Sequence, residues 1–123
     1  MSRSGRGEAA RRRGARAERV AALVLRLKGF AILARGHRAP QGEIDIVARR
    51  GRLLVFVEVK ARSDRDLAAQ ALRARQRARI ARAAAGFLAA RPGLAGLEAR
   101  FDAMVFGAWP WPRHVVDAWR DSP

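Results

Sequence analysis

Acidic and basic side chains recur inside two short apolar stretches, GEIDIVA and VFVEVKAR, between residues 42 and 62. Because successive side chains of a strand alternate between its two faces, Glu43 and Asp45 are expected on one face of the first stretch. The same alternation places Glu58 and Lys60 together on one face of the second. Two carboxylates about 4 Å apart repel by roughly 4 kcal/mol at the effective dielectric near a protein surface. Crowded carboxylates therefore need protonation, a cationic neighbour or a divalent ion, and Mg²⁺ accepts one or two of them while it keeps waters.

The two stretches are predicted to pair as an antiparallel hairpin, because few residues separate them and Arg50 and Gly51 suit a turn. Asp45 and Glu58 can then converge near the open end of the hairpin. Lys60, on the same face as Glu58, could position a water that attacks a phosphate and offset the charge that develops there. A half-buried hairpin with one polar solvent face shows the same alternation, so the pattern alone leaves both interpretations open.

Helices are predicted on either side of this hairpin in the sequence. The segment 17–28 is helix-forming and is ended by Gly29. Glu18 lies away from the predicted apolar face of this helix, beside Ala21, Ala22 and Leu25, where it could be partly buried. The residues of that apolar face are Val20, Leu23, Val24 and Leu27. After Arg62, the residues SDRD could cap a second helix that reaches about Ala90, where RPG stops it.

Further strands complete the predicted sheet. Residues 30–35 are predicted as the first strand and residues 36–42, with their glycines and proline, as a loop. Residues 97–106 are typical of a fourth strand, and HVVDAW (114–119) of a short last strand or a turn of helix. The predicted fold class is therefore α/β, with a mixed central sheet that contains an antiparallel hairpin and is flanked by helices.

Length and charge limit the possible functions. The 123 residues, half of them hydrophobic, suit one domain with a substantial core. Lys28 and Lys60 are the only lysines among 26 basic residues, which weakly favours a role for Lys60 that arginine cannot fill. With only 11 acidic residues the net charge is +15, so nucleic acid is the leading partner class. The absence of cysteine excludes disulfides and thiolate metal sites and fits a cytoplasmic protein. Charges interrupt each apolar stretch well before the ~18 residues of a membrane span.

The amino-terminal residues differ in composition from the rest of the chain. Residues 1–16 are rich in Arg, Gly and Ser and have no large apolar residue after Met1. Such a segment cannot bury enough surface to order itself. We predict a flexible basic arm over residues 1–16 and a single domain over residues 17–123.

Four segments in the order AERVAALVLRLKGFAIL, GEIDIVA, VFVEVKAR and RFDAMVF closely resemble the bacterial YraN-like family. This family is regarded as similar to archaeal-type Holliday junction resolvases, which have the restriction-endonuclease-like PD-(D/E)xK nuclease fold. The likeness covers about residues 16–120. It implies a metal-dependent endonuclease that acts on structured or branched DNA, with a possible homodimer that presents two sites.

The resemblance also implies roles for individual residues. The implied catalytic residues are Glu18, Asp45, Glu58 and Lys60. Asp45 and Glu58, helped by the carbonyl of Val59, would bind Mg²⁺ or Mn²⁺, and Glu18 would be an additional or water-mediated ligand. Glu8 competes with Glu18 for the position of the helix acid, but the spacing of Glu18 to Gly29 fits the family without a gap. Ile44 stands where the superfamily pattern has a proline.

Several basic and aromatic residues could contact nucleic acid. The predicted nucleic-acid-binding residues are Arg62, Arg73, Gln76, Arg77 and Arg79. The arginines could follow a phosphate backbone, although a solvated helix face gives the same pattern. Gln76 is expected to be buried and to face the site, or to cap a neighbouring loop. Trp109 and Trp111 could stack on exposed bases or cover the edge of a small core.

Two alternatives to a nuclease follow from the same residues. A non-catalytic protein that binds DNA or RNA would keep the acidic hairpin for folding, and an assembly factor would use its exposed Trp and Val residues to dock a protein partner. His37 and His114 lack metal-ligand spacing and are expected at the surface or in loops. Asp102 is expected to make a structural hydrogen bond or to pair with an arginine.

Overall fold

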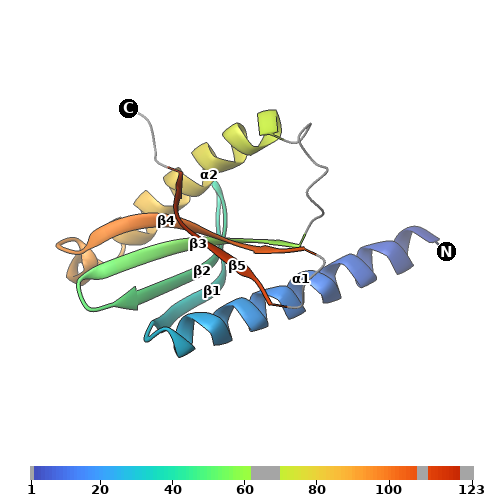
Figure 1. The fold of residues 1–123 in the computed structure, drawn as a ribbon. Coiled ribbons are helices and arrows are strands. Elements are labelled where there is room, and N and C mark those ends of the chain that lie inside the picture. Colours follow the sequence, from blue (N-terminus) through green and yellow to red (C-terminus); the bar gives the residue numbers. More distant parts are fainter. Residues whose placement is uncertain (1, 62–69, 108–110, 120–123) are drawn as a thin grey trace.

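Two helices pack on opposite faces of a five-stranded sheet (Figure 1). The computed structural model describes residues 2–61, 70–107 and 111–119. The elements in chain order are α1 (Ser2–Leu27), β1 (Ala31–Ala39), β2 (Gly42–Arg50), β3 (Leu53–Ala61), α2 (Gln70–Ala89), the short 3₁₀ helix η2 (Pro92–Leu94), β4 (Glu98–Phe106) and β5 (Arg113–Trp119). The α/β class is thereby confirmed. In the described ranges, no helix has the length and apolar character needed to cross a membrane.

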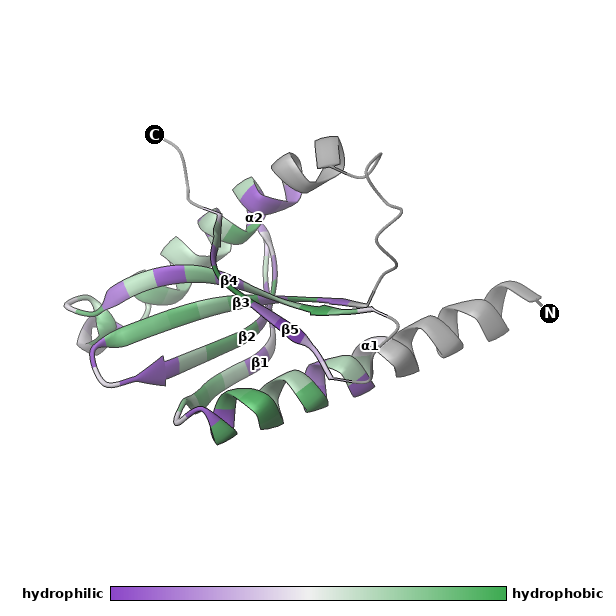
Figure 2. Cartoon of the chain, in the orientation of Figure 1, coloured by the Kyte–Doolittle hydropathy of each residue, from purple (hydrophilic) through white to green (hydrophobic). Residues whose placement is uncertain are grey.

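The sheet is mixed, as predicted. The strands lie side by side in chain order from β1 to β5. Neighbouring pairs are antiparallel except β3 and β4, which run parallel because α2 lies between them in the chain. The predicted hairpin of β2 and β3 is confirmed, with its turn at Gly51 and Arg52. β3 is hydrophobic along most of its length and lies in the middle of the sheet (Figure 2).

The loop predicted over residues 36–42 is wrong. β1 continues through Gly36 to Ala39, and a turn of two residues, Pro40 and Gln41, leads directly into β2. Gly36 adopts a φ of +59° inside the strand, a conformation that glycine reaches without steric cost. The glycine therefore bends a strand that the sequence pattern had ended there.

Two buried clusters fill the space between the sheet and the helices. The first lies under α1 and includes Leu25, Ile46, Val57 and Met104. The second lies under α2 and includes Ile44, Phe56, Phe87 and Trp119. β2 and β3 contribute to both clusters, which makes them the centre of the fold.

The face by which α1 packs on the sheet was predicted only in part, since Val24 is buried as predicted and Glu18 is partly buried beside Ala21, Ala22 and Leu25. Leu23 and Leu27 are 49% and 69% exposed, whereas the side of the helix that carries Glu18 is buried. The buried residues of α1 are Ala17, Ala21, Ala22, Val24 and Leu25. Alanines on the buried side let the helix axis approach the sheet closely, which larger side chains would prevent.

α1 also begins earlier than predicted. The helix extends back to Ser2, whereas the sequence pattern placed its start at Ala17. Alanine and arginine, which dominate residues 8–16, are both strong helix formers, and composition alone underrated this propensity. The flexibility of residues 1–16 stays a prediction.

The end of α1 is set by Gly29, as predicted. Gly29 has a φ of +91°, its N–H donates to the carbonyl of Arg26 at 3.0 Å, and the N–H of Phe30 donates to the carbonyl of Leu25 at 2.9 Å. This pair of bonds defines a Schellman motif. Leu25 and Phe30 are buried in the same cluster, so the motif also fixes the direction in which β1 leaves the helix.

The carboxy-terminal half follows the prediction in outline. α2 ends at Ala89 before RPG, β4 covers residues 98–106, and the last segment is a strand rather than a helical turn. Gln76, predicted to be buried, is exposed, because the side of α2 that faces the sheet carries Ile80, Ala83, Ala84 and Phe87.

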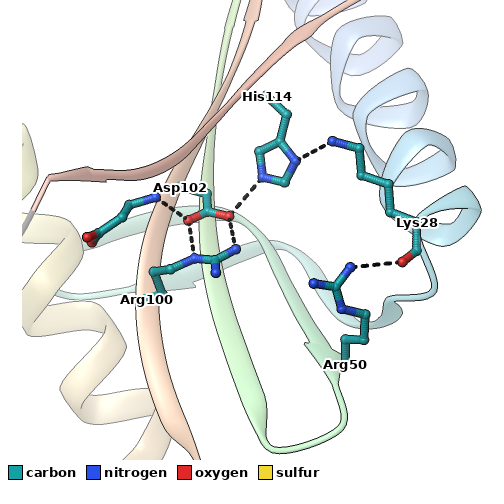
Figure 3. Close-up of polar contacts among 6 residues, drawn as sticks. Lys28, Arg50, Arg100, Asp102 and His114 are labelled. Atoms are coloured by element: carbon teal, nitrogen blue, oxygen red, sulfur yellow. Dashed lines mark hydrogen bonds and ion pairs between the residues drawn. The ribbon is translucent and has the colours of Figure 1, made fainter.

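Asp102 joins β4, β5 and α1 in one polar network (Figure 3). This fully buried carboxylate accepts two hydrogen bonds from Arg100 at 2.8 and 2.9 Å and one from the backbone N–H of Asp117 at 2.9 Å. It also pairs with Nε2 of His114 at 2.8 Å, and Nδ1 of His114 contacts Nζ of Lys28 at 2.8 Å. These contacts confirm the predicted pairing of Asp102 with an arginine.

Both histidines were predicted wrongly. The His114 side chain is only 6% exposed, within the Asp102 network. His37 lies in β1 and packs edge-on against Phe87, with ring centroids 5.1 Å apart. Each histidine thus has a structural partner from another element, which local sequence does not reveal.

Gly29→Ala should lower the free energy of unfolding by about 1–2 kcal/mol, because an L-residue is strained at this positive φ. The matched control is Gly86→Ala, an exposed position within α2 with open space around it. That change should raise the free energy of unfolding by about 0.5–1 kcal/mol. Urea denaturation measures both, and equal effects of the two substitutions would contradict the assignment of Gly29 as the helix stop.

Candidate active site

β2 and β3 separate partway along the hairpin. Their paired residues run from Arg50 and Leu53 to Ile46 and Val57, although both strands continue beyond this point. Where the pairing stops, Oδ2 of Asp45 accepts a hydrogen bond of 2.8 Å from the backbone N–H of Val59. A side-chain carboxylate therefore takes a position between the two strands that a backbone carbonyl would otherwise occupy.

The alternation of side chains along β2 is interrupted at the same place. Ile46 packs in the cluster under α1, whereas Ile44 packs in the cluster under α2. Residues two apart in a regular strand share a face, so the change of side means that Asp45 lies at an irregularity. Ile44 and Ile46 therefore point to opposite sides of the sheet instead of the same side, and the irregularity brings Asp45 toward α1.

Three acidic side chains line one cavity of about 330 Å³ beside this irregularity. Glu18 comes from α1, and Glu43 and Asp45 come from β2. The other residues of the lining are Gly14, Ala15, Ala17, Arg38 and Val59. The structure thus brings together two of the four predicted catalytic residues, Glu18 and Asp45, and adds Glu43.

Two of these carboxylates lie near Gly36 of β1. A Cβ atom at Gly36 would lie 3.8 Å from Oε1 of Glu43 and 4.0 Å from Oε1 of Glu18. Both acids therefore reach toward the same point of β1.

The environment of Asp45 raises its pKa to about 6. Burial is the largest cause, and the hydrogen bond from Val59 opposes it. The negative charges of Glu43, Glu18 and Glu58 raise the pKa further, in that order. Asp45 thus carries a charge at neutral pH that its surroundings disfavour.

Arginines of β1 balance the other two acids of the cavity. Nε of Arg35 lies 3.3 Å from Oε1 of Glu18, and Nε of Arg38 lies 3.9 Å from Oε2 of Glu43. Arg38 is highly exposed, so its pair contributes little stability. Within the described part of the chain, no basic side chain pairs in this way with Asp45.

Glu58 and Lys60 form an ion pair on the neighbouring strand, with Nζ 3.3 Å from Oε1. Glu58 is 6% exposed and Lys60 is 13% exposed. They alternate with Val57 and Val59, which face α1, so they point toward the α2 side of β3. The described lining of the cavity accordingly does not include them, although Glu58 is near enough to raise the pKa of Asp45.

Oxygen donors make this region suitable for a hard cation. Among the described residues, no three acidic or histidine side chains are gathered as a complete set of metal ligands. Mg²⁺ needs fewer, because it is commonly held by one or two carboxylates and keeps several waters. The donor types and the raised pKa of Asp45 fit such an ion, since a divalent cation would relieve the charge that burial disfavours.

The predicted nucleic-acid-binding residues lie in different structural environments. Arg62 and the side chain of Arg73 lie outside the described residues. Gln76 and Arg79 are exposed on α2. Arg77 is half-buried, with its guanidinium 5.8 Å from the centre of the Trp119 ring and its Nε without a hydrogen-bond partner.

Arg79 lies close to the start of β2. A Cβ atom at Gly42 would come within 3.1 Å of the Arg79 Cβ, so α2 and the start of β2 approach closely there. This approach places an exposed arginine beside the strand that carries Glu43 and Asp45.

Sequence reasoning did not assign Arg35, Gly36, Arg38 and Glu43 to the site. Three of them lie on β1, whose second half was predicted as a loop. An extended strand through residues 31–39 would have placed Arg35 and Arg38 opposite the acidic stretch. The signal available for Glu43 was its position two residues before Asp45, on the same predicted face.

Comparisons with known proteins place the chain among close relatives. The sequence pattern of "Uncharacterised protein family UPF0102" matches residues 17–106. A UPF0102 protein of Parvibaculum lavamentivorans is 54% identical over 114 residues, which cover 93% of this chain and 86% of the relative. One from Paramagnetospirillum magneticum is 54% identical over 117 residues, with 92% and 91% covered, and one from Bradyrhizobium diazoefficiens is 54% identical over 114 residues, with 93% and 86% covered.

Asp45→Asn should stabilise the fold at pH 7.5 by an amount of the order of 1–3 kcal/mol, since one pKa unit corresponds to about 1.4 kcal/mol. The folded-state pKa of about 6 lies above the ordinary value of 3.8. The unfolded state therefore loses this proton first as the pH rises, and the native state becomes less stable between these two pH values. The gain from Asp45→Asn should disappear near pH 4.

Urea denaturation at several pH values measures this difference. Glu98→Gln, which removes an exposed carboxylate, serves as the control and should change the stability little at any pH. If Asp45→Asn is less stable than the unsubstituted protein at pH 7.5, the charge of Asp45 does not destabilise the native state.

Proposed function

The chain belongs to the uncharacterised protein family UPF0102, the YraN-like family indicated by its motifs, and we propose that it is a nuclease dependent on Mg²⁺ or Mn²⁺. Its substrate would be structured or branched DNA, and its reaction the hydrolysis of a phosphodiester bond. The mixed five-stranded sheet with a helix on each face would then be a PD-(D/E)xK-type core.

The setting of Asp45 is the observation that carries this proposal. A half-buried carboxylate with a pKa near 6 lies between two separating strands, in a cavity with two further acids. Strongly perturbed carboxylates in a cavity are typical of functional sites, because a fold selected for stability alone would not retain them. The ion pair of Glu58 and Lys60 on the adjacent strand supplies the other residue types of a metal-dependent nuclease.

Each residue has a distinct task in the proposed reaction. Asp45 and Glu58 would hold the cation, with Glu18 as an additional ligand. Because Glu58 points toward the α2 side of β3 and lies outside the described lining of the cavity, its carboxylate would have to turn toward Asp45 when the cation binds. The bound cation would act as a Lewis acid on the phosphate and lower the pKa of a water. Lys60, kept in place by Glu58 at 3.3 Å, would orient the attacking water and offset the negative charge on the phosphate.

Hydrolysis then requires one bond to form and one to break. The oxygen of water attacks phosphorus, the bond to the leaving ester oxygen breaks, and that oxygen takes up a proton. Positioning and charge stabilisation are the main contributions of protein side chains to such a transfer. The burial of Glu58 and Lys60 favours both, because it restricts their motion and excludes competing water.

The charge distribution supports a polyanionic substrate. The net charge of +15 means that phosphate contacts would release counterions and make binding strongly dependent on salt. Arg79 is exposed beside the start of β2, and Arg35 and Arg38 lie at the cavity. These arginines could bind the phosphate backbone of a DNA strand that has one phosphate in the site.

A non-catalytic nucleic-acid-binding protein is the second candidate, and one observation favours it. Glu18 and Glu43 are already paired with arginines, and three ligands are not gathered in the described residues. In such a protein the acids would serve to order β1 and α1 against the hairpin. It would bind DNA or RNA with unchanged affinity after Asp45→Asn and cleave neither.

Cleavage of labelled DNA separates the two candidates. Single-stranded, duplex, flap and four-way-junction DNA would be incubated with Mg²⁺ or Mn²⁺ and with the purified protein. We expect metal-dependent products that Asp45→Asn and Lys60→Ala each reduce at least about a hundredfold, because loss of one group that stabilises the transition-state charge has an effect of this size.

Two controls make this test specific. Lys28→Ala removes the other lysine of the chain and should leave cleavage unchanged. Circular dichroism of each variant shows whether it is folded. Products that persist undiminished in Asp45→Asn would contradict the role of Asp45 as a metal ligand, and the absence of products from every DNA with either metal would contradict the proposed DNA nuclease.

A further inference from the structure

The pairing of the strands places the start of β5 at the same end of the sheet as Lys60, which lies near the end of β3. Lys60 of β3 lies opposite Val105 of β4, and Val105 lies opposite Arg113 of β5. Residues directly opposite each other share a face of the sheet, and neighbouring strands are about 4.8 Å apart. The backbone of Arg113 is therefore about 10 Å from that of Lys60, and the two side chains leave the sheet on the same side.

Trp111 stands two residues before Arg113 and is unusually exposed. Its exposed fraction is 54%, whereas Trp119 is 8% exposed and stacks on Phe101 with ring centroids 4.1 Å apart. Pro112, between Trp111 and Arg113, is buried and fixes its own φ. The tryptophan is thus attached to an anchored backbone, while much of its ring surface stays free.

Surface charge indicates what could cover this ring. Arg113 is exposed beside it, and the chain as a whole carries a net charge of +15. A second copy of the chain would meet strong repulsion, and an apolar peptide would leave the arginine without a partner. A nucleotide provides a partner for both residues, since its base can stack on Trp111 and its phosphate can pair with Arg113.

We propose that Trp111 is a stacking platform for an unpaired base of the DNA substrate and that Arg113 binds an adjacent phosphate. This inference rests on the proposed nuclease function. About 10 Å corresponds to some three steps of a stacked strand at ~3.4 Å each, so the phosphate bound by Arg113 lies about three nucleotides from the phosphate that Lys60 serves, and the base stacked on Trp111 is next to the former. Because bases within a duplex are covered on both sides, the preferred substrate has a single-stranded segment next to the cleavage point.

The test measures binding without cleavage. Fluorescence anisotropy in the presence of EDTA, at one fixed salt concentration, compares a blunt duplex with the same duplex carrying a single-stranded tail. Trp111→Ala should weaken binding of the tailed DNA about tenfold to a hundredfold, the range expected for loss of one stacked base, and change binding of the blunt duplex little. Trp111→Phe should retain most of the affinity for the tail.

Val116→Ala is the matched control, because Val116 is also 54% exposed and lies on β5. It should bind both DNAs like the unsubstituted protein. Equal affinity of Trp111→Ala and Val116→Ala for the tailed DNA would overturn the stacking role and leave the nuclease proposal intact. Tail-dependent binding lost in Trp111→Ala, in a protein that cleaves no DNA, would support the stacking role and contradict the nuclease. No binding of either DNA by the unsubstituted protein would overturn both proposals.

Discussion

The separation of β2 from β3 beyond Ile46 and Val57 is the constraint on which the rest of the site depends. Two paired strands leave no space between them, and their backbone groups satisfy one another. Once the pairing stops, the N–H of Val59 needs an acceptor, and the carboxylate of Asp45 supplies it. The same irregularity lets Asp45 face the cavity with Glu18 and Glu43 instead of following the regular alternation.

Asp45 and Asp102 show how the fold treats two inward-pointing carboxylates differently. Arg100, His114 and a backbone N–H surround Asp102, and these hydrogen bonds hold its pKa well below the ordinary range despite burial. Asp45 has one backbone donor and three acidic neighbours, and its pKa rises. The first arrangement stabilises the junction of β4, β5 and α1, whereas the second stores unfavourable charge where a cation or proton would relieve it.

The sequence predicted the elements that local pattern determines. The hairpin, the end of α1 at Gly29 and the mixed sheet are confirmed, because alternation, a turn glycine and a crossover helix act over short distances. The second half of β1 was missed, since a glycine at positive φ inside a strand looks like a loop in sequence. The buried face of α1 was predicted only in part, because packing favoured its alanines over the larger Leu23 and Leu27. The pairing of Arg35 with Glu18 depends on the tertiary meeting of α1 and β1, which no local pattern encodes.

The central claim is that Asp45 carries a disfavoured charge that a divalent cation relieves. It can be measured directly by NMR titration of the Asp45 carboxyl carbon with and without Mg²⁺, with Asp102 as an internal reference. We predict a pKa of about 6 for Asp45 without the ion, a marked fall of this pKa when Mg²⁺ is added, and no change at Asp102. A pKa near the ordinary 3.8 that Mg²⁺ does not alter would contradict the claim.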